Sequence, residues 1–199
     1  EQTQAMVLVQ KHLSCMRRAQ TTNVVRVKEG QEAETRDELL AHETTVDGDS
    51  ILHLAAKNTP EAMKECISTC GEQLLRTRNA KGQLPMHVAA VIGSLDVIKL
   101  LTHAYGGALK AADSGGNIPL HLATCNAPAE AVRFLLNRFP PGIVARNEHG
   151  DLPLHCAAAH ARSVEVIQLL SSGLTDLEQE EVQEHEEGME EEDEMEEAQ

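Results

Sequence analysis

The chain has 199 residues, which suits one domain with flanking tails, and its net charge of −15 comes from an acidic C-terminal tail beside a nearly neutral body. The sequence contains no dense cluster of Lys and Arg, so we expect no nucleic-acid binding. Aromatic residues make up 2% of the sequence, so the apolar Leu, Val, Ile and Ala residues favour thin helical layers over a globular core of large rings. Five cysteines without a CxxC pair favour reduced thiols in an intracellular protein, cytoplasmic or nuclear. No segment approaches ~18 consecutive apolar residues, so we expect no direct membrane insertion.

Residues 1–44 carry apolar side chains at helical spacing, first at Met6, Val9, Leu13 and Met16, and again in the segment 34–42. This pattern predicts an N-terminal helical cap or flanking segment that covers the exposed end of the region starting at residue 45. An amphipathic helix that binds a partner is the alternative.

A nine-residue pattern then occurs four times, as GDSILHLAA, GQLPMHVAA, GNIPLHLAT and GDLPLHCAA. Its histidines, His53, His87, His121 and His155, are 34 residues apart. A fixed period of this length is typical of stacked-repeat architectures, in which a unit cannot fold alone. The sequence therefore predicts units at 45–78, 79–112, 113–146 and 147–177.

Within the unit 79–112, the residues from Asn79 to Gly82 predict a turn with a positive φ at Gly82. Pro85 suits the first turn of a short helix that Gly93 ends, and Ser94 can cap a second helix. In the last unit we expect Gly173 to close the second helix.

This order of turn, helix, helix and loop resembles the ankyrin repeat, whose pattern D-x-x-G-x-T-P-L-H-x-A-A precedes a second helix with paired leucines. The resemblance covers about residues 45–173 and implies an all-α solenoid of stacked helix-turn-helix units joined by β-turn or hairpin loops. In the family a Thr hydroxyl bonds the histidine. Here that Thr is replaced by Ser50, Leu84, Ile118 and Leu152, so after the first copy we expect the histidines to find backbone partners.

The four histidines are one repeat apart, which is too far to share an ion, so we interpret them as structural bridges and expect no metal site. The sequence also contains no catalytic constellation, no phosphate-binding Gly loop, no GxSxG motif and no HExxH motif. We therefore expect no enzymatic activity, no catalytic residues and no cofactor.

The last 24 residues, 176–199, contain fourteen acidic side chains and neither Lys nor Arg. Like charges four residues apart oppose a helix, so we expect residues 178–199 to form a disordered acidic tail. Such a tail can confer solubility or bind a basic protein.

The resemblance implies a non-enzymatic scaffold for protein–protein interaction that binds its partner through the concave ankyrin surface. Alignment with the family assigns binding to the turn tips and the exposed side of the inner helices. These residues are Asp47, Asp49, Lys57, Asn58, Lys81, Gln83, Val91, Ile92, Asn117, Asn126, Glu148, His149, Asp151 and His160, with Val46, Ala80, Ser114, Gly115, Cys125 and Ala159 beside them. Because Val91 and Ile92 form an apolar pair, we expect an apolar or helical segment of the partner to bind there.

Two other functions stay open. The chain could escort a basic, ribosomal or histone-like client, with the acidic tail shielding the client's charges. It could also be the cytosolic ankyrin part of a larger membrane-associated protein, because GDSILHLAA and CGEQLLRTRNAKGQLPMHVAA resemble plant ankyrin–transmembrane proteins. In each case the partner is another protein, and the chain could be a subunit of a larger complex.

Overall fold

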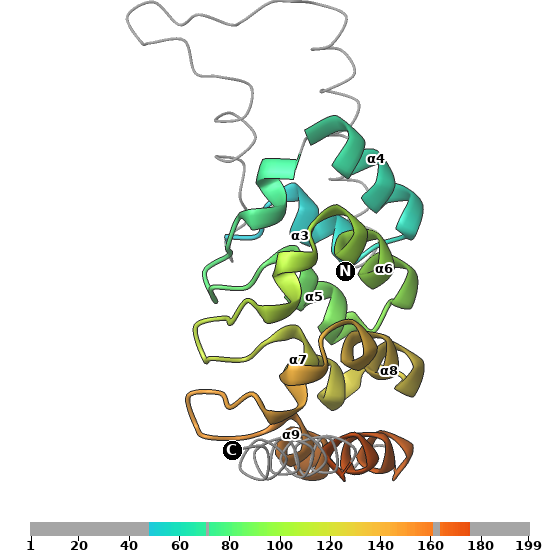
Figure 1. Ribbon diagram of the computed structural model, residues 1–199. Coiled ribbons are helices and arrows are strands. Elements are labelled where there is room, and N and C mark those ends of the chain that lie inside the picture. Colours follow the sequence, from blue (N-terminus) through green and yellow to red (C-terminus); the bar gives the residue numbers. More distant parts are fainter. Residues whose placement is uncertain (1–47, 71, 161–163, 176–199) are drawn as a thin grey trace, which may run out of the picture.

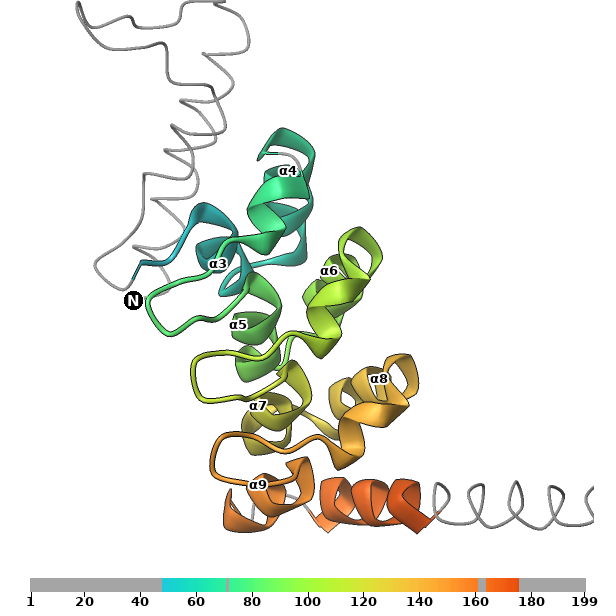
Figure 2. The same ribbon diagram turned by 60° about the vertical axis from the view of Figure 1, so that its left-hand side comes forward.

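The computed structural model describes residues 48–70, 72–160 and 164–175. The expected N-terminal cap, the positions Val46 and Asp47 and the acidic tail at 178–199 lie outside these residues. The described chain forms two columns of helices, joined by loops that project to one side (Figures 1 and 2). The expected all-α repeat stack is therefore confirmed.

The inner column contains one short helix from each repeat and the outer column contains its partner (Figure 1). The inner helices are α3 (Ile51–Ala56), α5 (Pro85–Ile92), α7 (Pro119–Asn126) and α9 (Pro153–His160). The outer helices are α4 (Pro60–Cys70), α6 (Leu95–Ala104), α8 (Ala129–Arg138) and the helix at 164–175.

Proline and glycine set the ends of the helices largely as the sequence predicts. Pro85 is the first residue of α5, where its missing N–H costs no hydrogen bond, and Gly93 ends the helix with a φ of 76°. Ser94 does precede α6, but its side chain makes no capping hydrogen bond, so that prediction is wrong. Its ψ of 98° lies far from the 163° at the N-cap of α5, so the entry to α6 has a different backbone geometry.

Three short 3-10 helices follow the outer helices, where the sequence predicted only loop. They are η1 (Glu72–Arg76), η2 (Gly106–Lys110) and η3 (Pro140–Val144). They pack against the neighbouring helices, and each buries one large side chain: Leu75, Leu109 and Ile143.

Gly173 does not close the last helix, which is helical through residue 175. A Cβ on Gly173 would lie 2.8 Å from the Cδ1 atom of Ile143 in η3. The glycine therefore permits close packing of the last helix on η3, and the expectation that it ends the helix is wrong.

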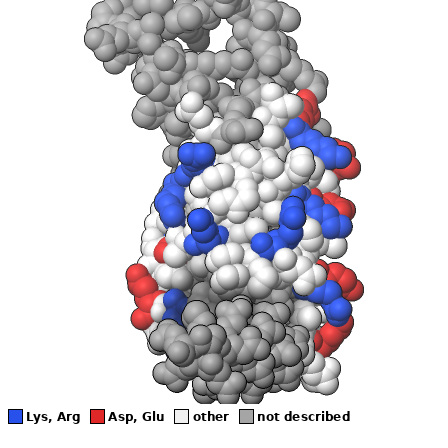
Figure 3. Space-filling view, viewed as in Figure 1, with Lys and Arg blue, Asp and Glu red and all other residues white. Residues whose placement is uncertain are grey.

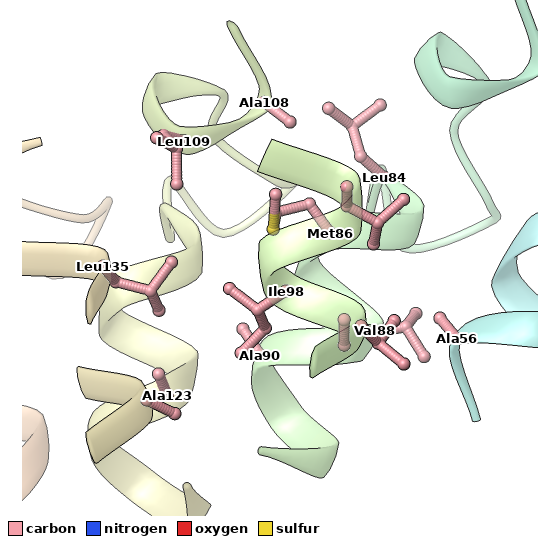
Figure 4. Close-up of a cluster of buried hydrophobic side chains, with 14 of the residues drawn as sticks. Ala56, Leu84, Met86, Val88, Ala90, Ile98, Ala108, Leu109, Ala123 and Leu135 are labelled. Atoms are coloured by element: carbon pink, nitrogen blue, oxygen red, sulfur yellow. The ribbon is translucent and has the colours of Figure 1, made fainter. Parts of the chain in front are cut away.

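The core is a continuous layer of small and branched side chains between the columns. Ala90 of α5, Ile98 of α6, Ala123 of α7 and Leu135 of α8 all lie in one buried cluster (Figure 4). Alanines at the inner positions let neighbouring helices approach closely, and the larger outer side chains fill the space that remains. Each repeat thus buries its apolar residues against the next repeat.

We expect Gly82→Ala to lower the free energy of unfolding by at least about 1 kcal/mol, because φ is +69° and a Cβ would lie 2.8 Å from the backbone nitrogen of Ser114. Gly106→Ala is the control, since a Cβ at that position meets nothing within 4 Å. Urea unfolding followed by circular dichroism measures both variants. Equal losses for the two would contradict the role assigned to the turn.

Candidate functional site

Buried histidines tie the first three inner helices, α3, α5 and α7, to the turn of the following repeat. The Nε2 atoms of His53, His87 and His121 lie 2.7, 3.1 and 3.0 Å from the carbonyl oxygens of the residues 30 positions later, Gln83, Asn117 and Asp151. The three rings are 0–1% exposed. The predicted bridging role is therefore present for these three, and the bridge runs between repeats. For His155 the prediction is wrong, because its ring is exposed and, among the described residues, accepts only the backbone N–H of Leu152 within its own repeat.

In His53 and His87 the opposite ring nitrogen, Nδ1, accepts a backbone N–H at the start of the same helix, whereas Nδ1 of His121 has no such bond among the described residues. The backbone N–H of Leu84 donates to Nδ1 of His87 at 3.0 Å, and the N–H of Ser50 donates to Nδ1 of His53 at 3.1 Å. In the first repeat the hydroxyl of Ser50 adds a contact of 2.8 Å to that Nδ1, whereas Leu84 offers only its backbone. Because Nδ1 accepts, the ring proton lies on Nε2, which donates to the carbonyl of the next repeat.

The protonation state of the rings follows from their burial. Burial lowers the pKa of His53, His87 and His121 below the ordinary value, and the carbonyl and carboxylate neighbours only partly offset it. A neutral ring is also what the hydrogen bonds require, since a protonated Nδ1 could not accept from the backbone. The bridge between repeats therefore depends on uncharged histidine.

Each turn is built around the side chain of its first residue. Oδ1 of Asn79 accepts the backbone N–H groups of Lys81 and Gln83, both at 3.0 Å. Asp113 and Asn147 make the same pair of bonds in the next two turns. Lys81, Glu148 and His149, which the sequence predicts as binding residues, lie exposed on these tips.

Other predicted binding residues are engaged between the turns. Gln83 Nε2 lies 3.4 Å from an Asp113 carboxylate oxygen, and the Asn117 side-chain oxygen accepts from Asn147 at 3.0 Å. Asp151 is half-buried and supplies the carbonyl that His121 bonds. These three residues contribute to the stack itself.

Asp49 and Lys57 form an ion pair of 2.7 Å beside the first inner helix, with Asp49 3% exposed. Burial by itself raises the pKa of the Asp49 carboxyl, but hydrogen bonds from Lys57 and Asn79 outweigh it and hold the pKa below its ordinary value. Asp49 is thus an ionised part of the stack, and its charge neutralises the half-exposed Lys57.

A strip of exposed residues follows the C-terminal halves of the inner helices. In α5 the buried His87, Ala89 and Ala90 face the core, so Val91 and Ile92 lie at the open side. Ile92 is 51% exposed and Val91 is half-buried. Two sets of residues in the other repeats complete what we call the inner-helix strip. The positions that correspond to Val91 and Ile92 are Lys57, Asn58, Cys125, Asn126, Ala159 and His160, and the half-exposed residues one turn earlier are Leu54, Leu122 and Cys156.

Two cysteines connect the strip across the third and fourth repeats. The thiols of Cys125 on α7 and Cys156 on α9 lie within hydrogen-bonding reach, which brings neighbouring repeats side by side at this face. Burial, with smaller effects from Cys125 and Asp151, raises the pKa of Cys156 to about 11. Both thiols are therefore protonated near neutral pH and add apolar rather than nucleophilic character.

Three members of the strip, Leu54, Leu122 and Cys156, were not predicted from the sequence. Each directly follows a buried histidine or its counterpart and lies three residues before a predicted strip residue, so both share one helix face. All three are half-exposed. In the second repeat the same position is Val88, which is 6% exposed, so the sequence contains no signal that separates these three residues from the core.

Within the described residues, no helix is long and apolar enough to cross a membrane. No group of three or more His, Cys, Asp or Glu side chains in that part of the chain could hold a metal ion.

Comparison with protein-family models identifies ankyrin repeats, in a model of three copies, over residues 12–113 and 105–180. The chain belongs to the ankyrin-repeat family. No curated protein matches the sequence. Ankyrin repeats generally mediate protein–protein interaction and are typically not enzymes. The matched region begins ahead of the first repeat that the sequence predicts, and it includes most of the segment predicted to be a cap.

We expect His87→Ala to lower the free energy of unfolding of this ankyrin protein by about 2–4 kcal/mol, because it removes a buried ring and the acceptor of the Leu84 N–H. It also removes the ring N–H from the carbonyls of Ala111 and Asn117, of which Asn117 still accepts the backbone N–H of Asp113. His155→Ala is the control, since the ring holds the same motif position but is exposed. Its expected loss is below about 0.5 kcal/mol. Chemical unfolding measures both, and equal losses would refute the bridging role.

The lowered histidine pKa values also predict how stability depends on pH. Between the ordinary pKa of about 6.5 and the lower folded values, the unfolded chain binds more protons than the native stack. Stability is therefore full above about pH 7 and falls as the pH drops below about 6.5, by up to about 1.4 kcal/mol per pH unit for each histidine. Urea unfolding between pH 7.5 and 5 tests this, and a flat profile would contradict it. His87→Gln should reduce the slope, and the exposed His149→Gln is its control.

Proposed function

We propose that this chain is a binding scaffold whose inner-helix strip takes an apolar, helical segment of a partner protein. The observation that carries the proposal is the pair Val91 and Ile92, which presents exposed apolar surface in the second of four repeats. Leu54 and Leu122 extend the apolar character to the repeats on either side. An amphipathic helix binds such a surface through side chains spaced three and four residues apart.

The electrostatics of the strip support an uncharged ligand. Its described charged residue, Lys57, is paired with Asp49, and the two thiols are protonated. Asn58, Asn126 and His160 form polar positions around the apolar residues. A partner would therefore be held mainly by burial of apolar area, with a few hydrogen bonds at the rim.

Replacing both Val91 and Ile92 with Glu should reduce partner affinity at least about 100-fold, because the complex would bury two carboxylates without partners. The control variant carries Glu at Val144 and Val164, which are 53% and 71% exposed and lie outside the strip. A photo-reactive amino acid at position 92 identifies the partner in extracts of the cells that make the protein. Isothermal titration then gives the two affinities.

Circular dichroism must show that both double variants keep the helical content of the parent. A partner that crosslinks equally from positions 92 and 164, or that binds the Val91/Ile92 variant with parental affinity, would overturn the proposal.

A further inference from the structure

Basic side chains gather where each outer helix leads into the next turn. Three segments, 70–78, 104–112 and 138–146, occupy this same phase of successive repeats and contain η1, η2 and η3. Together they hold five basic residues and one acidic residue, Glu72. The basic residues are exposed, and we call them the basic edge: Arg76, Arg78, Lys110, Arg138 and Arg146.

Contacts between repeats link the first and second segments of the basic edge. The guanidinium of Arg76, at the end of η1, lies 4.9 Å from the ring centroid of Tyr105, which leads into η2. Arg78 donates to the carbonyl oxygen of Ala112 at 2.6 Å, two residues beyond Lys110. In the middle of the view of Figure 3, Lys and Arg side chains stand without Asp or Glu beside them.

The basic edge has no anionic partner among the described residues. In the part of the chain that the structure describes, Lys and Arg form the ion pairs Lys57–Asp49 and Arg133–Glu165. Neither pair includes a residue of the basic edge. Ring and backbone contacts fix the guanidinium groups of Arg76 and Arg78 in position, so little side-chain entropy remains to be lost on binding a carboxylate. The basic edge therefore presents exposed cations that can bind the carboxylates of an acidic ligand.

The chain itself carries such a ligand close to the edge. Gly173 packs against Ile143 of η3, and the described chain ends two residues later, at Thr175. The next 24 residues, 176–199, hold fourteen carboxylates and no Lys or Arg. Packed helices are about 8–10 Å apart, so the first repeat is roughly 30 Å away, whereas 24 residues can span up to about 80 Å.

We propose that the acidic segment 176–199 binds the basic edge of its own ankyrin stack. Tethering at Thr175 gives the segment an effective concentration of about millimolar at the edge, far above that of an acidic segment on another molecule. Several carboxylates can engage several cations at once, so the contact is a network rather than one exposed ion pair. Salt weakens it, because the Debye length falls from about 10 Å at 0.1 M to about 3 Å at 1 M.

The basic edge is separate from the inner-helix strip. The strip follows the C-terminal halves of the inner helices, and the edge follows the C-terminal ends of the outer helices. A short turn joins α5 at Ile92 to α6 at Leu95, so the two helices are antiparallel. The C-terminal end of α5, which carries the strip, and the C-terminal end of α6, which leads to the basic edge, therefore lie at opposite ends of the layer. Bound acidic residues therefore leave the strip open, and this proposal does not depend on the proposed function.

A glutamate-specific protease measures the contact in the full chain, because bound glutamates are protected from cleavage. The test variant neutralises the edge with Arg76→Gln, Lys110→Gln and Arg138→Gln. The control variant makes the same charge change on the outer helices with Lys64→Gln, Lys99→Gln and Arg133→Gln, which are also exposed. A third variant, Arg76→Lys with Arg138→Lys, keeps the charge.

At about 20 mM salt, we expect cleavage within 176–199 to be at least about threefold faster in the test variant than in the parent, the control or the Lys variant. At about 500 mM salt the four rates should converge. Equal rates at low salt, or equal acceleration in test and control variants, would overturn the proposal. Protection that rises with protein concentration would also overturn it, because the acidic segment would then bind a second copy.

Discussion

The structure depends on the hydrogen bond that a buried, neutral histidine makes to the turn of the next repeat. His53, His87 and His121 each direct Nε2 to a carbonyl 30 residues later. In His53 and His87 the Nδ1 atom also accepts a backbone N–H at the start of their own helix. The Nδ1 atom of His121 is buried without a hydrogen-bond partner among the described residues. Without these rings, the N–H groups of Ser50 and Leu84 would lose their acceptor. The carbonyls of Gln83, Asn117 and Asp151 would keep only the backbone N–H that each accepts within its own turn. The histidine therefore sets the register between repeats, as the alanines and leucines set their separation.

This constraint determines which residues are available for binding. The turns use Asn79, Gln83, Asp113 and Asn117 for bonds within and between repeats, so only their tips remain free. The inner helices bury one face completely and present the other. The surface that we propose for partner binding is consequently the less polar face of the stack, and the basic residues gather on a different edge.

Much of this could be predicted from the sequence, because the period of 34 residues fixes the fold and Pro85 and Gly93 fix helix ends. The 3-10 helices could not be predicted, since nothing in Gly106 or Pro140 distinguishes a tight helical turn from a loop. The difference comes from Leu109 and Ile143, which join the buried cluster in the folded stack. Gly173 misled for a related reason: a glycine that ends a helix and one that permits close contact look alike in sequence. The choice of Gln83 and Asn117 as stacking rather than surface residues depends on partners in adjacent repeats. That pairing emerges only when the layers are assembled.

The most direct test of the histidine bridges is nitrogen-15 NMR of the imidazole rings in the intact chain at pH 7. The structure predicts that His53, His87 and His121 carry their proton on Nε2, with scalar couplings across the hydrogen bonds to the carbonyls of Gln83, Asn117 and Asp151. Rings protonated on Nδ1, or Nε2 protons in rapid exchange with water and without coupling to those carbonyls, would contradict the account.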